Sequence, residues 1–177
     1  MANIRHLAET SKASQGPKEL EWLLNRVDTI NPKRILEIGV HQGYSMQTWL
    51  KAWPKAFVVG VDNDLHDLKI LKRGDRHVVI AGDSHDPNTG PKIVEALKGE
   101  VDFLFIDGDH TYEGVKQDFI MYAPLVRKGG IIAFDDMDLF DNPTVEVYKF
   151  WNELMEGEKW SFSQTHQDSN GIGILYV

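Results

Sequence analysis

Apolar residues follow two different spacings along the chain, and the change from one to the other predicts strands and helices. Short, nearly continuous apolar runs are typical of strands buried on both faces of a parallel sheet. Such runs predict five strands, at residues 34–40, 56–62, 77–82, 101–106 and 131–135. Apolar residues at helical spacing between these runs predict helices at residues 43–53, 65–72, 91–98 and about 112–122.

The two ends of the chain add further elements. A polar segment, residues 1–16, is expected to be a loose arm or a short helix, and a helix is predicted from Pro17 to the stop at Asn31-Pro32. After an amphipathic helix at 144–155, two strands, at about 160–166 and 171–177, are separated by the turn Q-D-S-N-G. This spacing predicts an antiparallel hairpin.

Together these elements predict one α/β domain spanning residues 1–177. The expected fold is Rossmann-like: a doubly wound, mostly parallel sheet of seven strands, with a C-terminal antiparallel hairpin and helices on both faces.

Composition limits the classes of partner. The 177 residues carry a net charge of −8, which argues against nucleic acid or an anionic membrane as the main partner. The absence of cysteine excludes disulfides, thiolate nucleophiles and cysteine-based zinc sites. The first residues lack the apolar region of a signal peptide, and no run approaches the ~18 apolar residues of a membrane span. A cytoplasmic location is therefore expected.

Acidic residues stand at the ends of all five predicted strands of the main sheet. They are Glu37, Asp62, Asp83, Asp107 with Asp109, and Asp135 with Asp136; His110 follows Asp109. The carboxyl ends of parallel strands lie at one edge of a sheet, and α/β proteins bind their ligands there. The sequence therefore predicts a functional site at this edge.

The turn after the first strand, E-I-G-V-H-Q-G-Y-S, is expected to bind a nucleoside cofactor. Gly39 and Gly43 are present, but His41 replaces the second glycine of the dinucleotide motif G-x-G-x-x-G. Glu37 is expected to face the same crevice, where a carboxylate is unfavourable beside a pyrophosphate and favourable beside a cation. Asp62 is placed to accept hydrogen bonds from ribose hydroxyls. S-adenosylmethionine, with its sulfonium and ammonium groups, meets both requirements.

A cation site is predicted beside the cofactor. Asp107, Asp135 and Asp136 end neighbouring strands, so their oxygens can converge on one point. Carboxylates completed by water or substrate oxygens suit a hard divalent cation, most readily magnesium, with manganese or calcium as alternatives. Two simpler explanations stay open: Asp135 and Asp136 as turn formers, and Gly39 and Gly43 as residues that only permit a tight turn.

Taken together, these motifs resemble class I S-adenosylmethionine-dependent methyltransferases over about residues 34–137. The loop E-I-G-V-H-Q-G-Y-S is similar to that of the catechol O-methyltransferase branch. The runs F-I-D-G-D-H-T-Y-E-G-V-K-Q-D and L-V-R-K-G-G-I-I-A-F-D-D resemble small bacterial methyltransferases near the cephalosporin-hydroxylase-like proteins. The resemblance implies that Glu37, Gly39, Gly43 and Ser45 hold the methionine part, that Asp62 holds the ribose, and that Asp83 and Ser84 lie beside the adenine.

The expected cofactor-binding set also includes Asn63 and Asp107, which lie at the ends of their strands. His41 either touches the carboxylate of the cofactor or packs within the turn. In the metal-dependent O-methyltransferases the ligands are two aspartates and an asparagine, which Asp136 replaces here. That branch carries a lysine that acts as the base, three residues after the first ligand. This chain has His110 at that position, and the ordinary pKa of an imidazole, about 6.5, suits proton transfer at neutral pH.

The expected function is divalent-cation-assisted O-methylation of a small hydroxylated acceptor, with Asp107 and His110 as catalytic residues. A structural hydrogen bond of His110 to the loop backbone is the alternative for that residue. Metal-independent methylation, and a cofactor-binding module that acts only with a partner, are the alternative functions. The chain is short for such enzymes, so the acceptor is expected either to bind openly or to be covered by a second subunit, as in a homo-oligomer.

Overall fold

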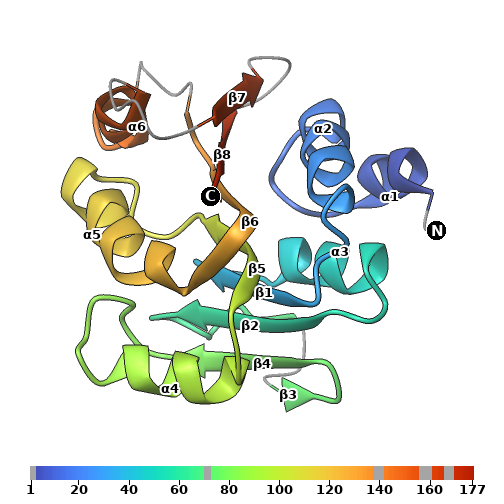
Figure 1. Cartoon of the computed structure of the whole chain (residues 1–177), viewed down its shortest axis with the longest axis horizontal. Helices are drawn as coiled ribbons and strands as arrows, with labels where there is room; N and C mark the ends of the chain where they lie inside the picture. Colours follow the sequence, from blue (N-terminus) through green and yellow to red (C-terminus); the bar gives the residue numbers. More distant parts are fainter. Residues whose placement is uncertain (1–2, 70–72, 138–141, 156–160, 166–169) are drawn as a thin grey trace.

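One mixed sheet forms the centre of the computed structural model, which describes residues 3–69, 73–137, 142–155, 161–165 (backbone only) and 170–177. Within these residues the sheet has eight strands in the order β3-β4-β2-β1-β5-β6-β8-β7 (Figure 1). The strands are β1 Arg34–Ile38, β2 Phe57–Asp62, β3 Arg73–Gly74, β4 His77–Ala81, β5 Val101–Ile106, β6 Val126–Phe134, β7 Ser161–Thr165 and β8 Ile172–Tyr176.

The pairing of the strands confirms the predicted fold class. Strands β4, β2, β1, β5 and β6 are mutually parallel, and β8 is antiparallel to both β6 and β7. The short β3, which pairs antiparallel with β4, adds an edge strand that the sequence did not predict. All six residues of β5 are buried, as expected for a central strand covered on both faces.

Helices cover both faces of the sheet, which makes the fold doubly wound (Figure 1). One face carries α1 Ile4–Thr10, α2 Pro17–Asp28 and α3 Tyr44–Ala52, and the other carries α4 Thr89–Leu97, α5 Tyr112–Tyr122, the short 3₁₀ helix η1 Ala123–Leu125, and α6 Val147–Met155. Two separate hydrophobic clusters hold these layers to the sheet. Trp49 and Phe103 belong to the first cluster, and Phe134 and Trp151 to the second. Among the described residues, no helix has the length and apolar surface needed to cross a membrane.

The helix predicted at residues 65–72 is wrong for residues 65–69, which form a turn flanked by irregular chain; residues 70–72 lie outside the described part. Asp62 Oδ1 accepts a hydrogen bond from the backbone N–H of Asp64, and Asp64 Oδ1 accepts one from the N–H of His66. Such short side-chain-to-backbone bonds compete with helix formation. They therefore stabilise a turn where the apolar spacing of the segment predicted a helix.

Of the two possibilities expected for the N-terminal segment, a loose arm or a short helix, residues 4–10 show the helix. Asn3 caps α1 by accepting a hydrogen bond from the N–H of His6, and Leu7 and Ala8 are buried. Beyond α1 the chain stays attached to the α3 layer, because Ser11 Oγ lies 2.7 Å from Thr48 Oγ1. Residues 12–14, which follow this contact, lie at the carboxyl edge of the sheet.

The order of the strands creates a crevice beside β1. From β1 the chain moves outward to β2 and β4, then crosses to β5 on the other side of β1. Loops after β1 and β5 therefore leave the sheet in opposite directions, at the switch point where α/β sheets bind ligands. Gly39 lies where these two loops touch: it has φ +86°, and a Cβ there would stand 2.0 Å from the carbonyl oxygen of Asp107.

Replacing Gly39 by alanine is expected to lower the free energy of unfolding by about 2–3 kcal/mol, because the methyl group both strains φ and forces the two loops apart. Urea unfolding followed by circular dichroism would measure the change. Gly90→Ala is the matched control, since a Cβ at Gly90 meets nothing within 4 Å. Equal unfolding midpoints for Gly39→Ala and the unmodified protein would contradict the prediction.

Candidate functional site

The carboxyl ends of the five parallel strands open into one cleft of about 790 Å³. This volume is in the range of small-molecule sites. Lys12, Ala13 and Ser14 of the N-terminal segment form part of its wall. Most predicted site residues line it: Gly39, His41, Gly43, Ser45, Asp62, Asn63, Asp83, Ser84, Asp107, His110, Asp135 and Asp136.

Glu37 is the exception, because it lies beneath the cleft and is fully buried. Ser45 Oγ donates a hydrogen bond to its Oε1, and Trp49 Nε1 donates one to its Oε2, each at 2.5 Å. Burial raises the pKa of Glu37 to about 8. This carboxyl group is therefore mainly protonated at neutral pH, and it supports α3 from below while Ser45 lines the cleft above it.

Asp62 shapes the glycine loop as well as lining the cleft. Its Oδ2 accepts hydrogen bonds from the N–H groups of Val40 and His41, at 2.8 and 2.6 Å, and its Oδ1 accepts from Asp64. A carboxylate has about four acceptor positions. Three are thus occupied by the chain itself, which leaves one for a ribose hydroxyl. His41, at φ +46°, and Gly43, at φ +79°, complete the turn in left-handed conformations.

Two residues that the sequence did not predict, His85 and Asp118, hold the loop after β4. His85 lines the cleft, and its Nε2 lies 3.1 Å from Oδ1 of Asp118, which is fully buried on α5. Burial raises the pKa of Asp118 to about 6. Tyr122 strengthens the same attachment by donating a hydrogen bond to the carbonyl of Ser84. Val115, Asp118 and Tyr122 are spaced as one face of a helix, and this face is buried. An aspartate among its apolar residues was the feature of the sequence that could have identified Asp118.

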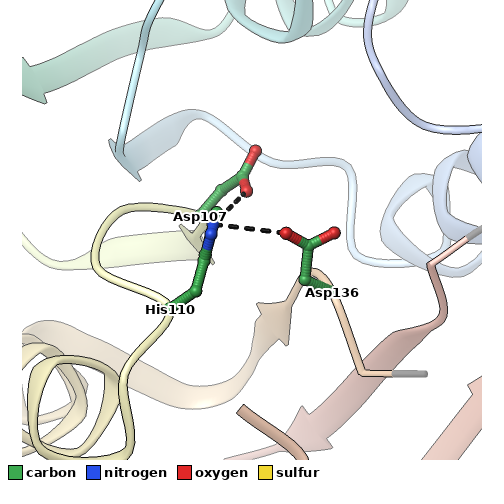
Figure 2. A group of neighbouring side chains, drawn as sticks. All are labelled: Asp107, His110 and Asp136. Carbon is green, nitrogen blue, oxygen red and sulfur yellow. Dashed lines mark hydrogen bonds and ion pairs between the residues drawn. The ribbon is translucent and has the colours of Figure 1, made fainter. Parts of the chain in front are cut away.

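Asp107, His110 and Asp136 form a compact group at the ends of β5 and β6 (Figure 2). One candidate ligand atom from each lies within 4.8 Å of the others. The Nε2 atom of His110 is 3.4 Å from Asp107 Oδ1 and 3.4 Å from Asp136 Oδ2. Asp136 has φ +58°, uncommon for a residue with a side chain, and its Oδ1 accepts a hydrogen bond from Asn170. Residues 138–141, which follow in the sequence, lie outside the described residues.

Asp135, the third expected carboxylate ligand, is not a member of this convergent group and has a different partner. Its Oδ2 accepts a hydrogen bond from Nε2 of Gln15, a residue that the sequence did not predict in the site. Its Oδ1 is buried and has no hydrogen-bond partner among the described residues.

The electrostatics of this acidic group fit a divalent cation. Burial, followed by the charges of Asp107 and Asp136, raises the pKa of Asp135 well above its ordinary value. Burial likewise raises the pKa of Asp107, and the hydrogen bond to Asp107 is the main cause of the raised pKa of His110. Burial, together with the neighbouring negative charges, thus disfavours the ionised form of both carboxyl groups. A cation with a preference for oxygen ligands would supply a compensating positive charge.

Comparisons with known proteins agree with the fold. Residues 36–137 match the family described as "Methyltransferase domain", which is more than half of the chain. A caffeoyl-CoA O-methyltransferase of Pinus taeda is 31% identical over 142 residues, covering 72% of this chain and 50% of that protein. The chain spans between 18% and 60% of the length of three other curated relatives.

Solved structures show the same architecture at low sequence identity. A putative caffeoyl-CoA O-methyltransferase from Staphylococcus aureus superposes with a TM-score of 0.76 at 17% identity, covering 99% of this chain and 92% of that chain. The MycE methyltransferase of the mycinamycin biosynthetic pathway, in complex with Mg, SAH and mycinamycin VI, gives a TM-score of 0.70 at 18% identity, covering 99% and 54%. From its Rossmann-like fold and the family match over more than half of its length, the chain belongs to the methyltransferase domain family.

Proposed function

We propose that the protein is an S-adenosylmethionine-dependent methyltransferase that methylates a hydroxyl group of a small molecule with the help of a divalent cation. The observation that carries the proposal is one cleft that joins the glycine loop after β1 to the carboxylate–imidazole group at the ends of β5 and β6. Family membership supports methyl transfer. The names of the pine and MycE relatives support an oxygen acceptor and Mg.

The cofactor would lie across the switch point. S-adenosylmethionine supplies a methyl group on a sulfonium, and its positive charges suit the carboxylates of the cleft. Gly43 and Ser45 would hold its methionine part and Asp62 its ribose. Asp83 and Ser84 lie on the β4 loop, at the position proposed for the nucleobase.

The cation would be held by carboxylate oxygens of Asp107, Asp135 and Asp136. When bound, a divalent cation lowers the pKa of the acceptor hydroxyl. His110 is proposed as the base that takes the hydroxyl proton, and the charges of Asp107 and Asp136, each 3.4 Å from its Nε2, would stabilise the resulting imidazolium. S-adenosylmethionine, when bound, would supply the methyl carbon to the acceptor oxygen, and its sulfur would leave with the electron pair of the carbon–sulfur bond.

Replacing His110 by alanine is expected to lower kcat by about 100-fold or more, the usual contribution of a positioned base, and to change cation affinity by less than about threefold. Single-turnover rates and calorimetric titration with Mn²⁺ would measure the two effects. His6→Ala is the control, because His6 is an exposed residue of α1. If cation affinity falls as steeply as the rate, His110 is a ligand rather than the base, a role that its position in the 4.8 Å group permits.

A thermal-shift panel tests the proposed function as a whole, because a ligand stabilises the state that binds it. The ligands are S-adenosylmethionine, S-adenosylhomocysteine and nicotinamide dinucleotides, each with and without Mg²⁺. Stabilisation by nicotinamide cofactors alone would exclude the methyltransferase. Cofactor binding without a cation effect would favour metal-independent methylation. Binding without turnover of hydroxylated acceptors would favour a module that acts with a partner.

A further inference from the structure

We infer that Gln15 is a positioning residue of the cation site: it fixes one oxygen of Asp135, leaves the other oxygen for the cation, and thereby links cation binding to the docking of residues 11–16. The inference rests on the proposed cation-assisted function.

The first support is the place of Gln15 in the fold. It comes from the segment between α1 and α2, yet its side chain reaches the ends of β5 and β6 and is only 6% exposed. Its Nε2 donates a hydrogen bond to Asp135 Oδ2 and lies 3.4 Å from Asp107 Oδ2. One amide group therefore contacts carboxylates from two neighbouring strands.

The second support is a buried oxygen without a partner. Asp135 is 4% exposed, and its Oδ1 has no hydrogen-bond partner among the residues that the structure describes. Leaving a buried carboxylate oxygen unpaired is costly, and either a proton or a bound cation removes that cost. Because Gln15 already holds Oδ2, a cation bound beside the group of Asp107, His110 and Asp136 would meet Asp135 through Oδ1. Hydrogen bonds of this kind orient ligating carboxylates, and their removal typically weakens metal binding by about 10- to 100-fold.

The third support is the way residues 11–16 are attached. Ser11 bonds to Thr48 of α3, and Gln15 bonds to the carboxylates, while Lys12, Ala13 and Ser14 between them line the cleft. The two attachments are different in kind, since only the second touches the proposed cation ligands. By reciprocity, if Gln15 strengthens cation binding, the cation strengthens the docking of this segment by the same factor.

The experiment measures the dissociation constant for Mn²⁺ by calorimetry on the purified full chain. Gln15→Leu and Gln15→Met remove the amide and keep most of its volume, and Ser11→Ala is the matched control that loosens the same segment without touching a carboxylate. We expect both Gln15 variants to weaken Mn²⁺ binding by about 10- to 100-fold, and Ser11→Ala to change it by less than about threefold. Far-UV circular dichroism and S-adenosylhomocysteine affinity establish that each variant is folded.

Hydrogen exchange provides a second measurement. Mn²⁺ should slow amide exchange of residues 11–16 in the unmodified protein and in Ser11→Ala, and should not do so in Gln15→Leu. Unchanged Mn²⁺ affinity in both Gln15 variants would overturn the inference about Gln15 and would leave the proposed function standing. An equal loss in Ser11→Ala would reduce Gln15 to a structural contact. If the unmodified protein binds S-adenosylhomocysteine but neither Mn²⁺ nor Mg²⁺, the cation-assisted function itself fails, and the inference fails with it.

Discussion

Replacing Asp107 by asparagine should abolish measurable cation binding and lower turnover by about 1,000-fold, equivalent to roughly 4 kcal/mol of transition-state stabilisation. Asp107 contacts two other residues of the site. Its Oδ1 lies 3.4 Å from Nε2 of His110, and its Oδ2 lies 3.4 Å from Nε2 of Gln15. Asparagine keeps the shape and removes the charge. The loss therefore reports on charge rather than on packing.

Two measurements separate this effect from a damaged fold. Calorimetric titration with Mn²⁺ gives cation affinity, and thermal unfolding gives stability. Asp109→Asn is the control from the same loop, because Asp109 accepts a hydrogen bond from the N–H of Thr111 and stands outside the compact acidic group. We expect it to change turnover by less than about tenfold. Full activity of Asp107→Asn at saturating cation would remove Asp107 from the mechanism.

Replacing Glu37 by glutamine should stabilise the protein increasingly as the pH rises from about 4.5 to 8. The pKa of Glu37 is raised from its ordinary 4.5 to about 8 in the folded protein, chiefly by burial. Below the ordinary value, both folded and unfolded states are protonated, so nothing is lost. Between the two values only the unfolded state has released its proton, and the free energy of unfolding falls by up to about 1.4 kcal/mol per pH unit. Above pH 8 the decrease ends.

By pH 8 the ionisation of Glu37 in the unfolded state has lowered the free energy of unfolding of the unmodified protein by on the order of 4 kcal/mol. Glutamine is neutral throughout, and its amide can accept from Trp49 and donate to Ser45, so the contacts of Glu37 are kept. Urea unfolding at pH 5 and pH 8 without ligands would measure the change. Glu100→Gln, at an exposed position just before β5, carries the same loss of charge and should leave the pH dependence unaltered. Identical pH dependence in Glu37→Gln and the unmodified protein would show that Glu37 is ionised in the folded state.

The sheet could be predicted from sequence because its signal is local and strong. The apolar run of β5 is buried on both faces, so no polar position interrupts it. The failed helix at residues 65–69 had a weaker apolar pattern, and the aspartates at 62 and 64 bond to the backbone two residues ahead. Local hydrogen bonds prevailed over periodicity there.

The sequence predicted those residues of the candidate site that directly follow the end of a strand, because the strand end determines their position. Glu37 shows the limit: side chains alternate along β1, and Leu36 and Ile38 pack with the α4–α6 layer while Ile35 packs with the α1–α3 layer. Glu37 therefore points under α3 instead of into the crevice. The helical spacing of α5 marks Asp118 as buried, but its pairing with His85, like the contact of Gln15, joins segments distant in the chain and leaves no short-range pattern.

The contact between Gly39 and the carbonyl of Asp107 has a consequence for how such a protein can diversify. It joins the glycine loop after β1 to the loop after β5 with no room for an added methyl group, so a side chain at position 39 would push the two loops apart. Under the proposed function, this contact would set the spacing between the cofactor and the acidic group. Variation in the acceptor would then have to be accommodated at other walls of the cleft, such as residues 12–14 of the N-terminal segment.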